Sequence, residues 1–241
     1  MRRIRACFDL ARAGNFPSVA SNVLAALVLS SFPLSAGFPP AGTLAVAILA
    51  GCLLYAGGAT FNDVFDAGFD ARHRPERAIP RGLISRGGAA ALATVEMLAG
   101  VALLVVMLDA SLPWTLALVA TILAYDWVHK KWIGSVVLMA GCRVLLACAL
   151  ATRPGHAFTM AFLGWVGALF VYIVTLSLIA RWEYKPGAPA AKIGRSVGRL
   201  LAFIPLIDAI ALLLVGEWIP AIACAIAVPL GRFAQRLAAS T

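Results

Sequence analysis

The chain has 241 residues, of which 62% are hydrophobic and 13% are charged, and its mean hydropathy is +0.91. A soluble domain is about half apolar and about a quarter charged, so this composition excludes a soluble globule, a disordered chain and a disulfide-stapled secreted domain. It predicts an all-α, polytopic transmembrane helical bundle.

A helix that crosses a bilayer needs roughly 20 mostly apolar residues. On this criterion the sequence predicts about eight spans, within a range of seven to nine. Their approximate bounds are 18–36, 41–61, 87–108, 112–127, 134–152, 157–180, 198–215 and 218–237. The segment DLARAGNFPS separates the basic start MRRIR from the first span, so we expect that span to be retained rather than cleaved as a signal peptide. We also expect residues 1–241 to form a single domain.

The basic residues are distributed unevenly between the two ends of the spans. All 20 Lys and Arg residues except Arg143 and Arg153 fall in segments that alternating spans place on one face. The positive-inside rule makes this face and both termini cytoplasmic. The net charge of +9 therefore predicts a multi-pass protein of a bacterial-type inner membrane in contact with anionic lipid. Because no basic and aromatic groove pattern accompanies the charge, nucleic acid is not an expected partner.

The second span ends in the acidic segment Asn62-Asp63-VF-Asp66-AGF-Asp70. Helix positions four apart differ by roughly 40° in azimuth, and positions three apart by roughly 60° the other way. Asn62, Asp66 and Asp70 therefore share one stripe, with Asp63 beside it. Carboxylates at this spacing repel one another unless a cation lies among them, and an oxygen-only donor set suits Mg²⁺.

Basic residues follow this acidic stripe directly in the chain. They are Arg72, Arg74, Arg77 and Arg81. Mg²⁺ that is bound by only a few carboxylates commonly shares its coordination with substrate phosphates. The two clusters together predict metal-assisted binding of a diphosphate. The alternative is a solvated loop in which the acids pair with the neighbouring arginines.

The segment NDVFDAGFD, followed by RPERAIPRGLIS, resembles the first Asp-rich motif of the UbiA superfamily of intramembrane prenyltransferases. That motif is NDxxDxxxD with a tail containing Arg, Pro, Gly, Ile and Ser, and Ala78 stands where the tail usually has Pro. The next loop on the same face, Tyr125-DWVH-Lys130-Lys131, is similar to a family loop whose Tyr and basic residues face the diphosphate.

One segment departs from the family pattern. A second Asp-rich motif is expected after the sixth span, but the chain reads Arg181-W-Glu183-Y-Lys185-PG there. Either one metal ion and the basic residues of this segment neutralise the diphosphate, or catalytic power has been lost. The departure resembles the divergent branch of the family called EboC-like.

The resemblance implies Mg²⁺-dependent transfer of an isoprenyl group from a prenyl diphosphate to a lipophilic acceptor within the membrane. The implied metal ligands are Asn62, Asp66 and Asp70, and the implied catalytic residues are Asp66, Asp70, Arg77 and Lys130. The implied substrate-binding residues are Asn62, Asp63, Tyr125, Lys131, Arg143, Arg181, Glu183 and Lys185.

Three ionisable residues, Glu96, Arg143 and Asp208, lie within predicted spans, as does the polar Asn22. Ionisable groups in hydrocarbon are costly and should face the bundle interior. Arg143 either lies near the diphosphate or acceptor, with Glu96 or Asp208 as its partner, or forms a structural ion pair.

Two other functions remain alternatives. CDP-alcohol phosphotransferases have a DxxDGxxAR motif, and the segment Asp63–Arg72 is similar to it except for one residue inserted around Gly68. The aspartates that should follow this motif are missing, since Arg86 stands where the first of them should be. A UbiA-like bundle without its second acidic motif could also bind or translocate a lipid-like metabolite without catalysis.

Overall fold

The computed structural model describes residues 2–31, 38–181 and 190–238, and within these ranges every regular element is helical. The elements are α1 (Arg2–Leu10), the 3₁₀ turn η1 (Ala13–Asn15), α2 (Phe16–Leu29), α3 (Ala41–His73), α4 (Arg86–Ala102), the π-helical segment η2 (Leu103–Met107), α5 (Leu112–Val128), α6 (Ser135–Ala151), α7 (Met160–Arg181), α8 (Ala190–Leu214) and α9 (Trp218–Leu237). The predicted all-α bundle is confirmed.

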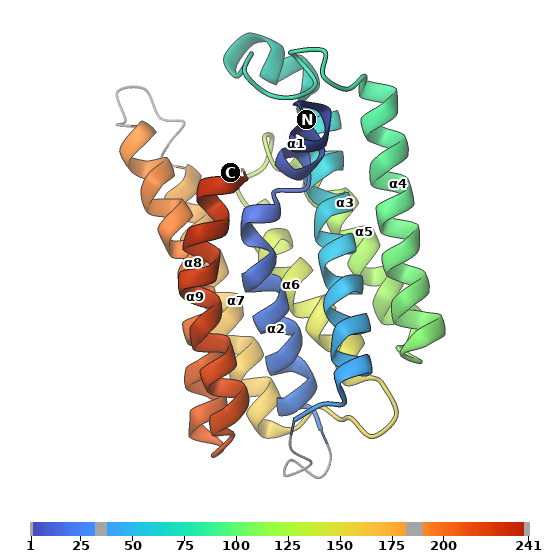
Figure 1. The fold of residues 1–241 in the computed structure, drawn as a ribbon, viewed down its shortest axis with the longest axis vertical. Coiled ribbons are helices and arrows are strands. Elements are labelled where there is room, and N and C mark those ends of the chain that lie inside the picture. Colours follow the sequence, from blue (N-terminus) through green and yellow to red (C-terminus); the bar gives the residue numbers. More distant parts are fainter. Residues whose placement is uncertain (1, 32–37, 182–189, 239–241) are drawn as a thin grey trace.

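Helices α2 to α9 run up and down the bundle in alternation (Figure 1). Both ends of the chain lie at the same end of the bundle, together with α1 and the connection 74–85; we call this the polar end. Helix α2 is the central element, because it contacts α3, α6, α8 and α9. Its residues Ala25 and Ala26 are fully buried.

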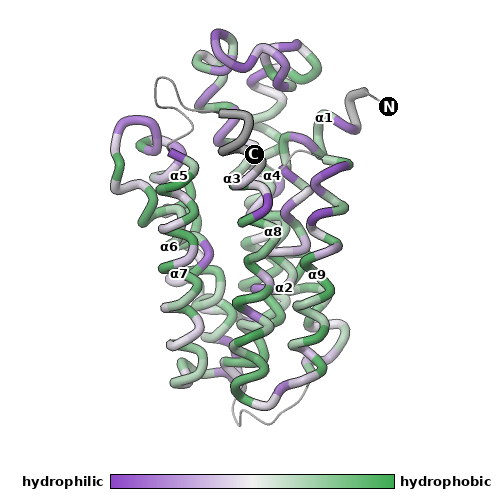
Figure 2. The backbone as a smooth tube through the Cα atoms, turned by 90° about the vertical axis from the view of Figure 1, so that its left-hand side faces the viewer, coloured by the Kyte–Doolittle hydropathy of each residue, from purple (hydrophilic) through white to green (hydrophobic). Residues whose placement is uncertain are grey.

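The outer surface of the bundle is apolar. Leu98, Val106 and Ile222 each have more than half of their surface exposed. Hydrophobic residues cover the length of the helices, whereas hydrophilic residues gather at the polar end (Figure 2). Soluble monomers rarely expose apolar patches of this extent. Among the described residues, 5 helices are long and apolar enough to cross a membrane, and α2, α5 and α6 are shorter apolar helices. The chain is a multi-pass membrane protein.

The eight predicted spans correspond one to one to α2–α9, but three of their bounds differ clearly: the ends of α2 and α3, and the start of α8, which begins at Ala190 rather than at 198. Helix α2 ends at Leu29, whereas the prediction placed the end at 36, and residues 32–37 lie outside the described part of the chain. Helix α3 continues past the predicted end at 61 as far as His73. It ends before Arg74-Pro75 because a proline disfavours helical backbone in the residue that precedes it.

The length of α3 positions the acidic segment. The helix has 33 residues and is therefore about 50 Å long, whereas the hydrocarbon core of a bilayer is about 30 Å thick. Its far end must extend beyond the apolar layer. Close packing against α4 fixes its direction, since a Cβ atom at Gly57 would lie 2.5 Å from the Cγ atom of Met97. Small residues allow such close approach between membrane helices.

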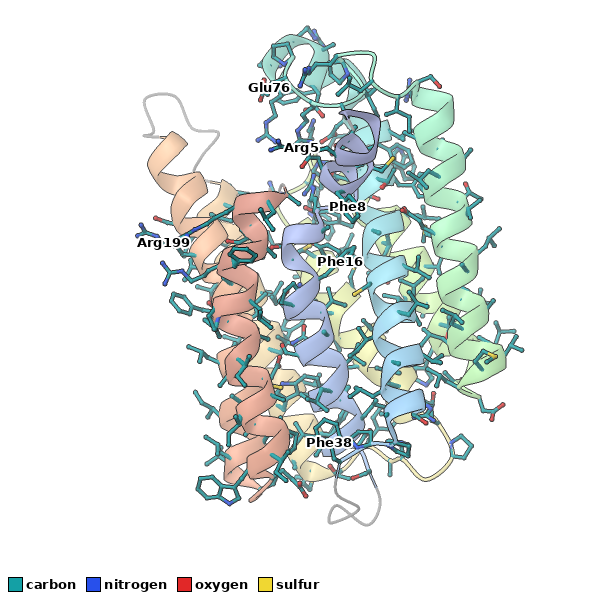
Figure 3. The ribbon with its side chains drawn as sticks, viewed as in Figure 1. Arg5, Phe8, Phe16, Phe38, Glu76 and Arg199 are labelled. Carbon is teal, nitrogen blue, oxygen red and sulfur yellow. The ribbon has the colours of Figure 1, made fainter. Side chains whose placement is uncertain are left out.

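Helix α1 was not predicted and lies across the polar end (Figure 1). Its apolar side chains Ala6 and Leu10 are buried against Ala78 of the connection 74–85. Its opposite side exposes Arg5 and Phe8 (Figure 3). Helix α1 therefore packs against the basic connection 74–85, which follows the end of α3.

Candidate active site

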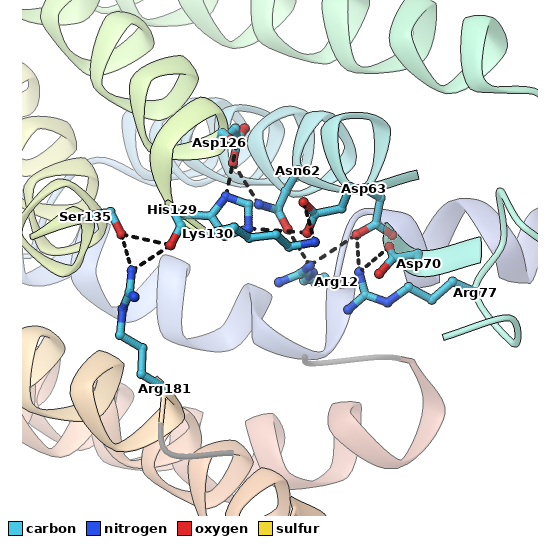
Figure 4. A network of polar contacts seen from close by, with 11 residues as sticks. Arg12, Asn62, Asp63, Asp70, Arg77, Asp126, His129, Lys130, Ser135 and Arg181 are labelled. Atoms are coloured by element: carbon cyan, nitrogen blue, oxygen red, sulfur yellow. Dashed lines mark hydrogen bonds and ion pairs between the residues drawn. The ribbon is translucent and has the colours of Figure 1, made fainter. Parts of the chain in front are cut away.

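The acidic stripe on α3 is buried at the polar end of the bundle. Asn62, Asp63, Asp66 and Asp70 are each at most 9% exposed. Each of the three carboxylates contacts a basic side chain from another part of the chain (Figure 4). The acids do pair with basic residues, as the alternative interpretation expected, but in a buried cluster rather than in a solvated loop.

Two arginines neutralise one side of the stripe. The Nη1 atom of Arg77 lies 2.8 Å from Asp63 Oδ1 and 3.1 Å from Asp70 Oδ2. The Nη2 atom of Arg12 donates to Asn62 Oδ1 at 3.0 Å and lies 3.2 Å from Asp63 Oδ1. Burial is the largest single effect and lowers the pKa of the Arg12 guanidinium, but Asp63, Tyr55 and Tyr125 together outweigh burial, so the net pKa is raised. Arg12 is thus a fixed cation.

The backbone of Arg12 is unusual, because its φ of 46° and ψ of 46° lie in the left-handed region. Residues other than glycine adopt this conformation only where the surrounding structure determines it. Here it turns the chain between α1 and η1 and directs the guanidinium toward α3.

The end of α5 neutralises the other side of the stripe. Lys130 Nζ lies 2.7 Å from Asp66 Oδ1 and 3.6 Å from the centre of the Phe69 ring. His129 Nε2 lies 3.3 Å from Asp66 Oδ2. The His129 ring stacks on Tyr125 with centroids 5.2 Å apart. The predicted residue Lys130 therefore lies at the stripe, and the predicted residue Tyr125 packs against His129, which contacts Asp66.

Asp126 of α5 also contacts the stripe. Its Oδ1 atom accepts a hydrogen bond of 3.1 Å from Asn62 Nδ2. Its Oδ2 atom is buried and has no hydrogen-bond partner among the described residues. This bond fixes the side-chain amide of Asn62 so that its oxygen faces Arg12.

Arg181, at the end of α7, reaches the site only through the α5–α6 connection. Its Nη2 atom donates to the backbone oxygens of His129 and Trp132 at 2.6 and 2.8 Å and to Ser135 Oγ at 2.6 Å. Arg181 therefore holds His129 in place and makes no described contact with the acidic stripe. Lys131 is exposed. The predicted residues Glu183 and Lys185 lie outside the described residues.

Arg143 lies deeper in the bundle. Its guanidinium donates to the backbone oxygen of Ser18 at 3.1 Å, to Ser18 Oγ at 3.0 Å and to Asn22 Oδ1, and it lies 5.7 Å from the centre of the Tyr55 ring. Tyr55 precedes Asn62 on α3 by about two helical turns. Arg143 therefore lies beside a part of α3 that is about two helical turns away from the start of the acidic stripe.

Asp208 is linked to Arg143 through Asn22. The Nδ2 atom of Asn22 donates to both carboxylate oxygens of Asp208, at 2.9 and 2.8 Å. Ser21 and Trp165 donate to the same carboxylate. This network joins α2, α6, α7 and α8, so the structure favours the structural interpretation of these buried charges. Glu96 is not part of the network, since it accepts a hydrogen bond of 3.4 Å from Thr60.

Three residues of the site were not predicted from the sequence: Arg12, Asp126 and His129. The signal for Asp126 and His129 was present, because both lie between Tyr125 and Lys130, one helical turn apart. Arg12 was counted only for topology, and no pattern in the sequence connects it with α3.

The donor atoms at this site fit Mg²⁺ in chemistry. The side chains of Asn62, Asp63, Asp66 and Asp70 carry oxygen atoms, which Mg²⁺ prefers. Among the described residues, however, no three His, Cys, Asp or Glu side chains are close enough together to hold a metal ion. Basic side chains contact these oxygens in the structure: Lys130 contacts Asp66, Arg77 contacts Asp70, and Arg12 contacts Asn62.

Residues 22–240 match the UbiA prenyltransferase family. The chain belongs to this family. A digeranylgeranylglyceryl phosphate synthase of Thermococcus kodakarensis is 34% identical over 142 residues, which cover 56% of this chain and 50% of that protein. The synthase of Methanopyrus kandleri is 30% identical over 167 residues, 66% of this chain and 59% of that protein. The chain therefore spans only about half to three fifths of the length of these relatives.

Two solved structures share the fold. The first, of a digeranylgeranylglyceryl phosphate synthase in membranes, has a TM-score of 0.61 at 15% identity and covers 98% of this chain and 95% of that chain. The second, of a UbiA homologue from Archaeoglobus fulgidus bound to DMAPP and Mg²⁺, has a TM-score of 0.57 at 15% identity and covers 94% of this chain and 84% of that chain. The assignment to an EboC-like branch stays a prediction.

Proposed function

We propose that this protein transfers an isoprenyl group from a prenyl diphosphate to a lipophilic acceptor within the membrane, with Mg²⁺ bound by Asn62, Asp66 and Asp70. The observation that carries the proposal is the buried acidic stripe of α3, which lies at the polar end of an apolar bundle among basic side chains. The names of the relatives, which are synthases of a prenylated glyceryl phosphate, support the same reaction class.

The basic side chains bind the diphosphate group in this proposal. Arg77 and Lys130 are paired with carboxylates in the described structure. Asn62, Asp66 and Asp70 would hold the metal ion, and Arg77 and Lys130, released from Asp70 and Asp66, would then be available to the diphosphate oxygens. Arg181 acts as a positioning residue, because its bonds hold the backbone on either side of Lys130. When bound, the metal supplies Lewis-acid stabilisation of the departing charge.

The bundle supplies the apolar surroundings that the reaction needs. Loss of diphosphate from an allylic substrate leaves a carbocation, which water would quench, and the packed helices exclude water from it. The acceptor then attacks this cation. No described side chain is assigned as the base that removes the acceptor's proton.

The distribution of charge supports one orientation of the bundle. The basic connection 74–85, the α5–α6 connection and both chain ends belong to the polar end. By the positive-inside rule this end faces the cytoplasm of a bacterial-type inner membrane and contacts anionic lipid. A water-soluble prenyl diphosphate head then reaches the site from the cytoplasm. Residues 1–241 act as one domain, without nucleic acid as a partner.

The test uses the purified full chain in detergent with Mg²⁺ and labelled prenyl diphosphates of several lengths. We expect release of inorganic diphosphate and a labelled lipid product when a membrane lipid extract supplies the acceptor. Both should disappear in Asp66→Ala and persist in Asp109→Asn, because residue 109 belongs to the connection between η2 and α5 at the opposite end of the bundle. Substrate binding without turnover would instead favour the non-catalytic carrier, and transfer from a CDP-linked lipid would favour the phosphotransferase.

A further inference from the structure

Asp126 differs from the other carboxylates at the polar end in its partners. Asp63, Asp66 and Asp70 are each paired with a basic side chain. Asp126 is 4% exposed, and among the described residues no basic side chain bonds to its carboxylate. A buried carboxylate oxygen without a hydrogen bond is costly. A cation bound beside Asp126 would satisfy this oxygen.

The position of Asp126 directs this carboxylate toward the acidic stripe. Asp126 and His129 are one turn apart on α5, and they contact Asn62 and Asp66, which are one turn apart on α3 (Figure 4). The two helices therefore present facing oxygen donors, with the carboxylate of Asp126 bonded directly to a predicted metal ligand. The unpartnered Oδ2 atom belongs to the same side chain.

We propose that Asp126 is itself a ligand of the divalent cation, supplied by a second helix. The inference rests on the proposed function and adds a residue to its metal site. The segment after α7 provides one carboxylate, Glu183, where two acids were expected. Asp126 provides a second-helix carboxylate from α5 instead. In the absence of metal it also holds the amide of Asn62 in the orientation that presents the Asn62 oxygen.

The test measures binding of Mn²⁺ to the purified full chain by electron paramagnetic resonance, with and without a non-hydrolysable prenyl diphosphate analogue. Asp126→Asn keeps the size of the side chain and an oxygen that can accept from Asn62, but it removes the charge. We expect the Mn²⁺ dissociation constant to rise by about tenfold or more, the range found when groups around a metal are altered. Asp109→Asn, the same change at the opposite end, should leave the constant unchanged. Asp126→Glu should recover part of the affinity.

A second variant separates a ligand from a residue that only supports Asn62. Asp126→Cys places a soft thiolate at the same position, and thiolates favour soft ions over hard ones. We expect this variant to bind Cd²⁺ more tightly, and Mn²⁺ more weakly, than the wild type. A residue that acts only through Asn62 would not change the metal preference, and an unchanged preference would overturn the proposal.

The outcomes also separate this inference from the proposed function. If Asp66→Asn weakens Mn²⁺ binding but Asp126→Asn matches the wild type, Asp126 is not a ligand and the α3 site stands. If the wild type binds Mn²⁺ no better than Asp66→Asn, the metal site itself is refuted, and this inference with it.

Discussion

Replacement of Arg77 by methionine tests whether cations of the chain occupy the place of a metal ion. Arg77 makes two charge-assisted hydrogen bonds, to Asp63 at 2.8 Å and to Asp70 at 3.1 Å. Asp63 keeps Arg12 in the variant, but Asp70, whose side chain is 2% exposed, loses its basic partner. Removal of one member of a buried pair costs about 3–5 kcal/mol. Because the Arg77 side chain is 14% exposed, we expect the lower value.

The expected loss of about 3 kcal/mol corresponds to a fall in Tm of about 6–12 °C for a chain of this size. Mg²⁺ should restore much of it, because a ligand at a hundred times its dissociation constant stabilises a protein by about 2.7 kcal/mol. The Mg²⁺-dependent rise in Tm should be larger in Arg77→Met than in the wild type, where the arginine competes with the metal for both carboxylates.

The assay is thermal unfolding of the purified protein in detergent across a Mg²⁺ titration. Arg81→Met is the matched control, since Arg81 lies in the same connection and is exposed. An equal Mg²⁺ response in Arg77→Met and the wild type would refute the competition between the arginine and the metal. A Tm for Arg77→Met equal to that of the control would refute the energetic role of the buried pair.

Three further predictions concern other parts of the molecule. Lys130→Met should lower kcat/KM for the prenyl diphosphate by about 10–100-fold, the equivalent of one charge-assisted hydrogen bond of about 1.5–3 kcal/mol. Arg236→Met, an exposed change at the end of α9, should not, and equal losses in steady-state assays would contradict the assignment. Asp208→Leu should destabilise the bundle by about 3–5 kcal/mol because it leaves buried donors unpaired, and a wild-type Tm would argue against a structural network. Burial lowers the pKa of His156 below its usual 6.5, so the unfolded chain takes up the proton more readily and stability should fall as the pH drops through 6.5. The pH dependence of Tm should flatten in His156→Gln, and an unchanged slope would contradict this.

The arrangement of the membrane helices follows closely from the sequence because hydropathy records directly which segments cross the apolar layer. The prediction was least accurate at the end of α3. The prediction stopped at 61, where polar residues begin, but a helix does not end where hydropathy falls. Helix α3 ends at His73, because Pro75 disfavours helical backbone at Arg74. Helix α1 was missed because at 9 residues it is too short to produce a hydropathy signal.

The candidate site divides into a part that is local in sequence and a part that is not. The spacing of Asn62, Asp66 and Asp70 defines one helix face without reference to the rest of the fold. The partners of those residues come from distant segments, and nothing local indicates that Arg12 lies beside Asp63. The link between Asp208 and Arg143 is also non-local. The sequence identified both as buried charges, but only the structure places Asn22 between them.

The most direct measurement is a crystal structure with Mn²⁺ and an unreactive thio-analogue of a prenyl diphosphate, with anomalous diffraction locating the metal. The proposal predicts an anomalous peak within bonding distance of Asp66, with the diphosphate beside it and Lys130 turned from the carboxylate toward the phosphate oxygens. A peak elsewhere, with Lys130 still bonded to Asp66 as in the described structure, would contradict it.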